Sequence, residues 1–123
     1  MRNVVRTMKI PVFRKGHEEE GFHWIDLTSE VTHFSHTRKG IEIHTKDHVY
    51  TPITTLEEWR MFLNPLGYEK LDVGNAVNMN LVEVFDEESQ KVFFEKNPDP
   101  TESKFADVAR VHIAKVVHLK KDD

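Results

Sequence analysis

With 123 residues, 38% of them hydrophobic and 31% charged, the chain has the size and composition of one globular domain. It contains no cysteine, which excludes disulfide bonds and metal sites held by thiolates. No apolar run near its start is long enough for a signal peptide or a membrane span. We therefore expect a cytoplasmic protein without a membrane partner. We expect a single domain over residues 1–123, with an ordered core at 8–119 and flexible ends at 1–7 and 120–123.

The formal net charge of −4 disfavours binding to nucleic acid, but the basic residues are clustered. Residues 1–16 contain five lysines and arginines and no acid, and residues 104–121 contain five with a single acid, Asp107. Because phosphate contacts are local, a chain that is acidic overall can still present one basic face. The alternative is that both basic segments are ordinary solvated surface.

The first half of the chain carries the pattern of short strands separated by polar turns. Alternating apolar residues predict strands at 8–13, 22–27 and 31–36. The clearest strand follows Gly40, where Ile41, Ile43 and Thr45 alternate with polar residues. A polar turn then predicts a hairpin in which residues 48–53 return as the partner strand.

One helix is predicted near residues 55–63. Thr55 can cap its first turn, and Glu58 completes the pattern of a capping box. Leu56, Trp59, Phe62 and Leu63 share one face, with Trp59 expected as the core anchor, and Pro65 ends the helix.

Beyond the helix the pattern returns to short extended segments, at 68–71, 75–85 and 91–95. A loop with two prolines follows at 97–103, and the last segment predicts a strand near 106–113 with a short helical end. No alternation of strands and helices is present. The fold class predicted is therefore mostly β: antiparallel β-sheets of seven to ten short strands with one short helix near 55–63.

Three pieces between Trp24 and Glu95 carry a resemblance to a known family. The first is a strand, a polar turn and a strand, VTHFSHTRKGIEIHT. The second is a strand that runs into a short helix, HVYTPITTLEEWRMFLNPLGY. The third is YEKLDVGNAVNMNLV, followed by a hairpin that ends in KVFFE. In this order and spacing, the chain resembles the LytTR DNA-binding domain family, as a free-standing and divergent member.

The resemblance implies a transcriptional regulator that contacts DNA through loops between strands. The implied partners are double-stranded DNA and a second copy of the chain on paired half-sites, and no receiver domain is expected. Arginine and lysine would neutralise phosphates or read guanine edges, and Asn75 would pair with adenine. Three segments are implied to bind DNA, with the residues His36, Arg38, Lys39, Lys70, Asn75, Arg110, His112 and Lys115.

The sequence departs from the family pattern at Asp72, Val73 and Gly74, where members carry a basic triplet. A carboxylate in a loop that faces phosphate would repel DNA, while Lys70 keeps a basic position of the pattern. Asn78 matches the Asn of the family's Val-Asn pair and is expected to bond the backbone at a bend. The alternative function is therefore a LytTR-like fold that has lost DNA binding and serves as a protein-interaction or ligand-binding module.

Catalytic and metal chemistry have little support in the sequence. His33 with His36, and His44 with His48, have ligand-like spacings, but residues three apart on a strand point to opposite faces. The chain has neither a nucleophile-elbow motif nor a glycine-rich phosphate loop. We expect a protein that is not an enzyme and has no catalytic residues, cofactor or metal ligands.

Overall fold

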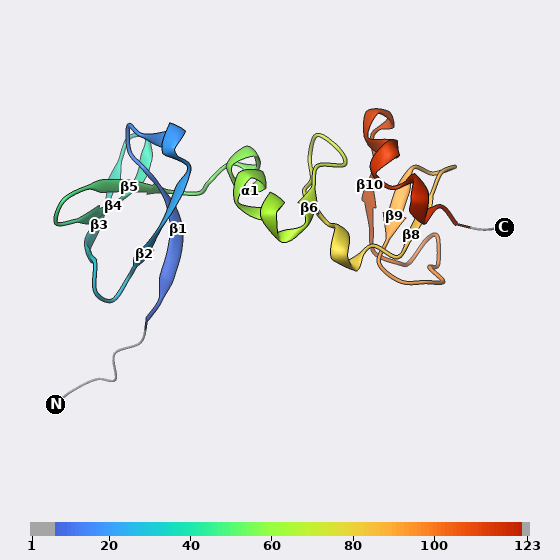
Figure 1. Ribbon diagram of the computed structural model, residues 1–123, viewed down its shortest axis with the longest axis horizontal. Helices are drawn as coiled ribbons and strands as arrows, with labels where there is room; N and C mark the ends of the chain where they lie inside the picture. Colours follow the sequence, from blue (N-terminus) through green and yellow to red (C-terminus); the bar gives the residue numbers. More distant parts are fainter. Residues whose placement is uncertain (1–6, 122–123) are drawn as a thin grey trace. The chain divides into compact units, whose positions relative to one another are not determined.

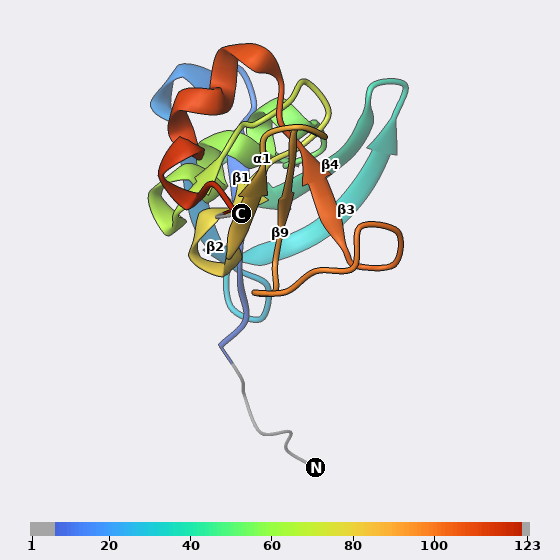
Figure 2. The same ribbon diagram turned by 90° about the vertical axis from the view of Figure 1, so that its right-hand side faces the viewer.

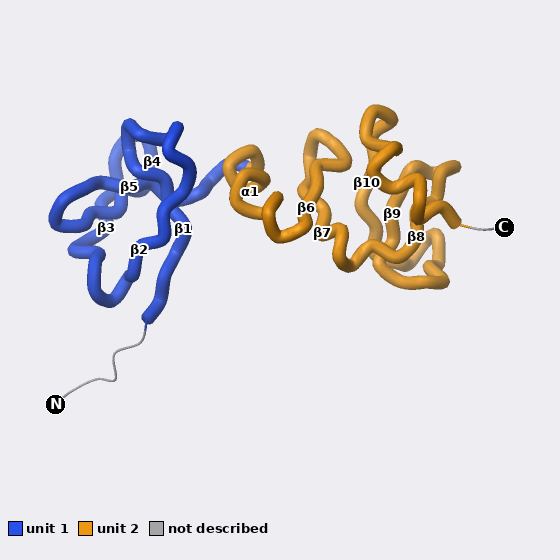
Figure 3. Tube along the Cα trace, in the orientation of Figure 1, with its two compact units in different colours: residues 1–55 blue, residues 56–123 orange. Residues whose placement is uncertain are grey.

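The computed structural model describes residues 7–121 (Figures 1 and 2). The contacts divide the chain into two compact units, Met1–Thr55 and Leu56–Asp123, each with a hydrophobic core of its own (Figure 3). The sequence predicts one domain over the same length. The flexible ends predicted for residues 1–7 and 120–123 fall largely outside the described residues. Lys121, which is described, is held by a backbone hydrogen bond to Phe85.

Unit 1 is one five-stranded antiparallel sheet in the order β2-β1-β5-β4-β3. The β3–β4 hairpin has a register irregularity between Val31 and His33. A short 3₁₀ helix, Glu18–Glu20, connects β1 to β2. The strands are β1 (Lys9–Arg14), β2 (Phe22–Asp26), β3 (Val31–Thr37), β4 (Gly40–Thr45) and β5 (Val49–Pro52).

The core of unit 1 comes from the strand alternation that the sequence predicts. Val12, Ile25, Ile43 and Tyr50 are buried together, with Ile10 and Val31 packed against them. Ile43 is 1% exposed whereas Ile41, two residues nearer the hairpin tip, is 42% exposed. The end of the β3–β4 hairpin is therefore less covered than its base.

Unit 2 begins with α1 (Leu56–Leu63), which continues into a 3₁₀ turn, Asn64–Leu66. Two short strands, β6 (Tyr68–Glu69) and β7 (Val77–Asn78), pair as an antiparallel ribbon. A three-stranded antiparallel sheet follows in the order β10-β9-β8. Its strands are β8 (Val84–Asp86), β9 (Lys91–Phe93) and β10 (Phe105–Asp107).

Three further 3₁₀ helices complete unit 2, and its core draws on segments from Leu71 to Val116. The helices are Met79–Leu81, Arg110–Lys115 and Val117–Leu119. The buried cluster consists of Leu71, Val77, Val82, Phe85, Val92, Val108 and Val116. Leu71 belongs to the loop described below and Val108 lies two residues before the Arg110–Lys115 helix, so the core of unit 2 supports that region directly.

The predicted fold class is confirmed: the described chain forms three antiparallel sheets with one short α-helix. The single strand predicted near 106–113 is wrong beyond Asp107, because Arg110–Lys115 forms a 3₁₀ helix. The extended segment predicted at 75–85 is interrupted by the Met79–Leu81 turn, which Asn78 caps. Among the described residues, no helix has the length and apolar character needed to cross a membrane.

Trp59 is not the core anchor of α1 that its helical spacing predicts. Its side chain is 39% exposed and lies edge-to-face with Phe62, 5.8 Å between ring centroids. No residue of α1 is buried. The half-buried Arg60 instead points toward the loop that follows β6, as shown by its hydrogen bonds to the backbone of that loop.

Candidate functional site

The predicted DNA-binding residues are distributed over both units, and each unit is described separately. Unit 1 contributes the hairpin turn that joins β3 to β4. Unit 2 contributes the loop between β6 and β7, here called the 70–75 loop, and the 3₁₀ helix Arg110–Lys115, here called the basic helix. His36, Arg38 and Lys39 belong to unit 1, and Lys70, Asn75, Arg110, His112 and Lys115 belong to unit 2.

The turn of unit 1 is shaped by its own side chains and a glycine. The Thr37 hydroxyl donates to the Gly40 carbonyl at 3.1 Å and accepts the Lys39 N–H at 3.2 Å. Gly40 has φ = 125°, a conformation that side chains disfavour. Arg38 and Lys39 are therefore exposed at the tip. His36 is also exposed, on β3 opposite Ile41.

An ion pair in unit 1 compensates the carboxylate nearest the basic tip. The Lys15 ammonium group donates a hydrogen bond to Glu42, whose side chain is 13% exposed. This bond, with the charge of Lys39, holds the pKa of Glu42 below its usual value. Because Glu42 is paired with Lys15, it reduces the net positive charge around the tip less than an unpaired carboxylate would.

In unit 2 the amide of Asn75 closes the 70–75 loop. Its Oδ1 accepts the N–H groups of Leu71 at 3.1 Å and Asp72 at 2.9 Å. Its Nδ2 donates to the carbonyl of Asp107 at 2.9 Å. The side chain is therefore engaged inside the protein and is not presented to a ligand. This corrects the expectation that Asn75 pairs with adenine, because both ends of its amide hold backbone groups.

Arg60 of α1 binds the other side of the same loop. Its guanidinium group donates to the carbonyls of Val73 at 2.7 Å and Asp72 at 3.2 Å. Two further hydrogen bonds, at 2.8 and 3.0 Å, reach the carbonyl of Asn75. Only 16% of the Arg60 side chain is exposed. One half-buried cation thus binds three loop carbonyls, and its guanidinium group also pairs with the exposed carboxylate of Glu57 at 3.7 Å.

The 70–75 loop and the basic helix lie side by side (Figures 1 and 2). The Ala109 N–H, one residue before the helix, donates to the carbonyl of Leu71 at 2.7 Å. From the last residue of the helix, Lys115 Nζ donates to the Lys70 carbonyl at 3.1 Å and pairs with Glu69 at 3.3 Å. The loop and the helix therefore form one edge of unit 2, joined at both ends of the helix.

The exposed side chains on this edge include Lys70, Val73, Arg110 and Val111. Within the described residues, no carboxylate lies in ion-pair distance of Lys70 Nζ or the Arg110 guanidinium group. Asp72 is half-buried, and its Oδ1 accepts the N–H of Val73 at 2.8 Å. The carboxylate that the sequence places against DNA is thus turned back onto its own loop.

The structure divides the predicted residues of unit 2 into two groups. Lys70 and Arg110 are exposed and without a described acidic partner. Asn75 and Lys115 bond the protein's own backbone, and His112 is half-buried within the basic helix. Because residues 110–115 are helical, Arg110 and His112 do not alternate along a strand as the sequence predicts.

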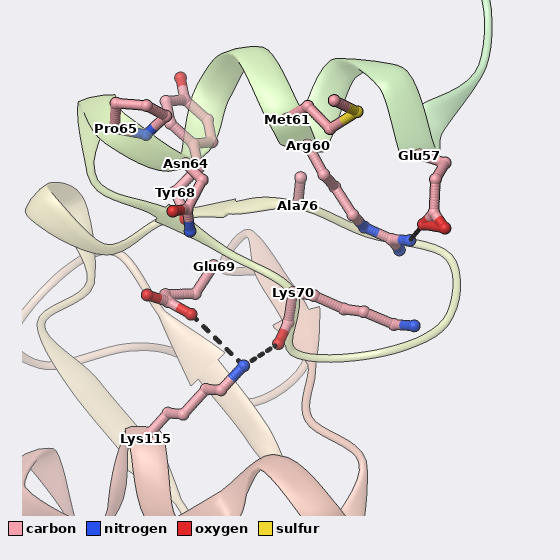
Figure 4. A pocket seen from close by; sticks show the side chains of 10 residues that line it. All are labelled: Glu57, Arg60, Met61, Asn64, Pro65, Tyr68, Glu69, Lys70, Ala76 and Lys115. Atoms are coloured by element: carbon pink, nitrogen blue, oxygen red, sulfur yellow. Dashed lines mark hydrogen bonds and ion pairs between the residues drawn. The ribbon is translucent and has the colours of Figure 1, made fainter. Parts of the chain in front are cut away.

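An open hollow of about 740 Å³ lies between α1 and the 70–75 loop (Figure 4). Met61, Pro65 and Tyr68 supply apolar surface, and Lys70 and Lys115 supply amino groups. The Lys115 contacts to Glu69 and to the Lys70 carbonyl cross one side of the hollow. Any molecule that entered would therefore meet the same residues that join the loop to the helix.

The histidines that lie together in the structure are not those with ligand-like spacings in the sequence. His33 and His44 face each other across β3 and β4, with their rings stacked at 4.2 Å. In the described part of the chain, donor atoms of three potential metal ligands converge at one place, His17, Glu19 and Glu20, on the surface of unit 1. The sequence analysis did not single out this group.

Three residues of this edge were not predicted as part of the site: Arg60, which holds the loop, and the exposed Val73 and Val111. Arg60 lies three residues before Leu63, so the helical spacing could have predicted that it shares the inner face of α1. The exposure of Val111 had no such signal, because it depends on residues 110–115 being helical.

Comparisons of the sequence with protein-family models and with curated proteins, and of the structure with solved structures, found no match.

Proposed function

We propose that the chain is a DNA-binding transcriptional regulator of the LytTR type, which contacts double-stranded DNA through inter-strand loops. The observation that carries the proposal is the edge of unit 2, where a loop fixed by Arg60 and Asn75 lies against the basic helix. Loops held in one conformation can bind with little loss of conformational entropy. Lys70 and Arg110 are the charges available there for phosphates or guanine edges.

The turn of unit 1 adds a second set of contacts to the proposal. Arg38 and Lys39 are exposed at a tip that Thr37 and Gly40 shape, and Lys15 pairs with Glu42 of the adjoining strand β4. Local positive charge at loop tips is what phosphate binding requires, whatever the net charge of the chain. Two copies on paired half-sites, in the cytoplasm, complete the proposed arrangement.

Selection of bound sequences from a random duplex library, followed by gel-shift titration, tests the function. The Arg110→Gln variant should weaken binding to every duplex and reduce the slope of log K against log salt by about one phosphate contact. Lys96→Gln is the matched control, because it removes the same charge from an exposed position in the connection between β9 and β10, outside the loop and the basic helix. Failure of the unmodified chain to retain any duplex at low salt would refute the proposal.

The hollow in unit 2 favours a second candidate function, that of a ligand-binding module which has lost DNA binding. Its lining combines apolar walls with three cations, Arg60, Lys70 and Lys115, against the two carboxylates of Glu57 and Glu69, which leaves a net positive charge that suits a small amphipathic anion. Titration with phenylacetate, followed by backbone amide chemical shifts, tests this candidate, with neutral 2-phenylethanol as the matched probe. Saturable shifts around Met61 and Tyr68 with phenylacetate alone, in a chain that retains no DNA, would favour the module over the regulator.

A further inference from the structure

Two valines on the edge of unit 2 are far more exposed than their surroundings. Val73 is 78% exposed and Val111 is 81% exposed, whereas Val108 and Val116, which flank the basic helix, are 3% and 0% exposed. A single exposed valine is ordinary, but two on the same supported edge form a feature that calls for a physical account.

Val73 is held in place by hydrogen bonds of its own backbone, and Val111 by the helix that contains it. The carbonyl of Val73 accepts from Arg60 at 2.7 Å, and its N–H donates to Asp72 at 2.8 Å. Val111 lies within the basic helix, where the His112 N–H donates to the Ala109 carbonyl at 2.9 Å. The structure therefore presents two short, stiff apolar side chains that lose little rotamer freedom on contact.

A cation lies near each valine in the chain. Arg110 is adjacent to Val111, and Lys70 lies three residues before Val73. The carboxylate of Asp72, next to Val73, accepts the Val73 N–H. The cores of protein–protein interfaces are depleted of charge and enriched in aromatic residues, which this edge lacks. A surface that presents methyl groups together with cations instead suits the major groove, where thymine methyl groups lie between phosphate backbones.

We propose that Val73 and Val111 read the 5-methyl groups of thymine in the major groove, while Lys70 and Arg110 bind flanking phosphates or guanine. This inference rests on the proposed DNA-binding function and adds a base preference to it. At position 73 the family pattern has a polar reader; here an apolar side chain replaces hydrogen-bond readout with methyl contact. The departure from the family pattern then changes which base is recognised and does not abolish recognition.

Replacement of thymine by deoxyuridine tests the inference, since it removes only the 5-methyl group. On a duplex selected by the unmodified chain, uracil at a contacted position should weaken binding about threefold to tenfold, the scale of one buried methyl group. In Val73→Ala the uracil penalty should shrink toward onefold at one position, and in Val111→Ala at another. Val117→Ala, which truncates a partly exposed valine of the next 3₁₀ helix, should leave every penalty unchanged.

Three outcomes separate the possibilities. Position-specific loss of the uracil penalty in the two valine variants supports the inference. Equal penalties in the variants and the unmodified chain, or no penalty at any thymine, overturn it while leaving DNA binding intact. Absence of any retained duplex refutes the proposed function itself and the inference with it.

Discussion

Removal of the Arg60 guanidinium group should open the 70–75 loop without unfolding the rest of unit 2. Arg60→Met keeps the aliphatic volume and a similar helix propensity but loses the hydrogen bonds to the Asp72, Val73 and Asn75 carbonyls. A hydrogen bond to a charged group contributes about 1.5–3 kcal/mol. Because water can reach carbonyls in a surface loop, we expect about 2 kcal/mol for the whole set, not for each bond.

Native-state hydrogen exchange measures this loss directly. The N–H groups of Leu71 and Asp72 are protected by Asn75 Oδ1, and this contact requires a closed loop. A loss of about 2 kcal/mol corresponds to roughly 30-fold faster exchange of these two amides. Amides paired between β8 and β9 should exchange at the original rate, since Arg60 contacts neither strand in the described structure.

Arg60→Lys is the control variant. It keeps the positive charge but cannot reproduce the forked geometry that reaches three carbonyls, so its exchange rates should be intermediate. If exchange of Leu71 and Asp72 in Arg60→Met stays within about threefold of the original rate, the loop is closed by other contacts. The account of Arg60 as the anchor of the site would then be refuted.

Four further variants probe the two units. Asn75→Ala removes three hydrogen bonds, to the backbone of Leu71, Asp72 and Asp107. It should lower the free energy of unfolding by about 1–3 kcal/mol in urea denaturation, and a change below about 0.5 kcal/mol would contradict the assignment. Gly67 has φ = 100°, and a new Cβ there would lie 2.7 Å from Asn80 Nδ2, so Gly67→Ala should lower the free energy of unfolding by about 1–3 kcal/mol. Gly74 has open space around it, so Gly74→Ala should change that free energy by less than about 0.5 kcal/mol. Equal melting temperatures for the two variants would contradict this. The Thr28 hydroxyl and N–H donate hydrogen bonds to Asp26 and lower the pKa of its carboxyl group. The ionised carboxylate therefore stabilises the fold at pH values above its unfolded pKa, and this contribution is lost as the pH falls through its folded pKa. The melting temperature of Asp26→Asn should thus drop less than that of the original chain between about pH 6 and about pH 3.

The sequence predicts most strands of unit 1 correctly because each has one buried face. Ile43 and Tyr50 belong to alternating patterns whose period of two survives in the structure. Prediction is poorer in unit 2, where strands are two or three residues long and hydrophobic residues alternate with 3₁₀ turns. A pattern over 106–113 that fits both a strand and a helix cannot be resolved locally, because contacts with Leu71 and Lys70 decide it.

The candidate site could be predicted only in part, for a similar reason. The exposed charges Arg38, Lys39, Lys70 and Arg110 are visible as clusters in the sequence. Which polar residues hold the loop is not visible, since Asn75 and Arg60 act on backbone groups 3 to 32 residues away. Sequence patterns report side-chain chemistry, whereas these contacts depend on where the backbone carbonyls and N–H groups lie in space.

The conformation of the 70–75 loop does not depend on which side chain stands at its tip. Arg60 binds main-chain carbonyls and Asn75 binds main-chain N–H groups. Every amino acid except proline carries both groups. The side chain at position 73 can therefore be exchanged with little effect on the loop's conformation. Such a scaffold would let new binding preferences arise by single substitutions, in nature or in the laboratory, without a compensating change in the framework.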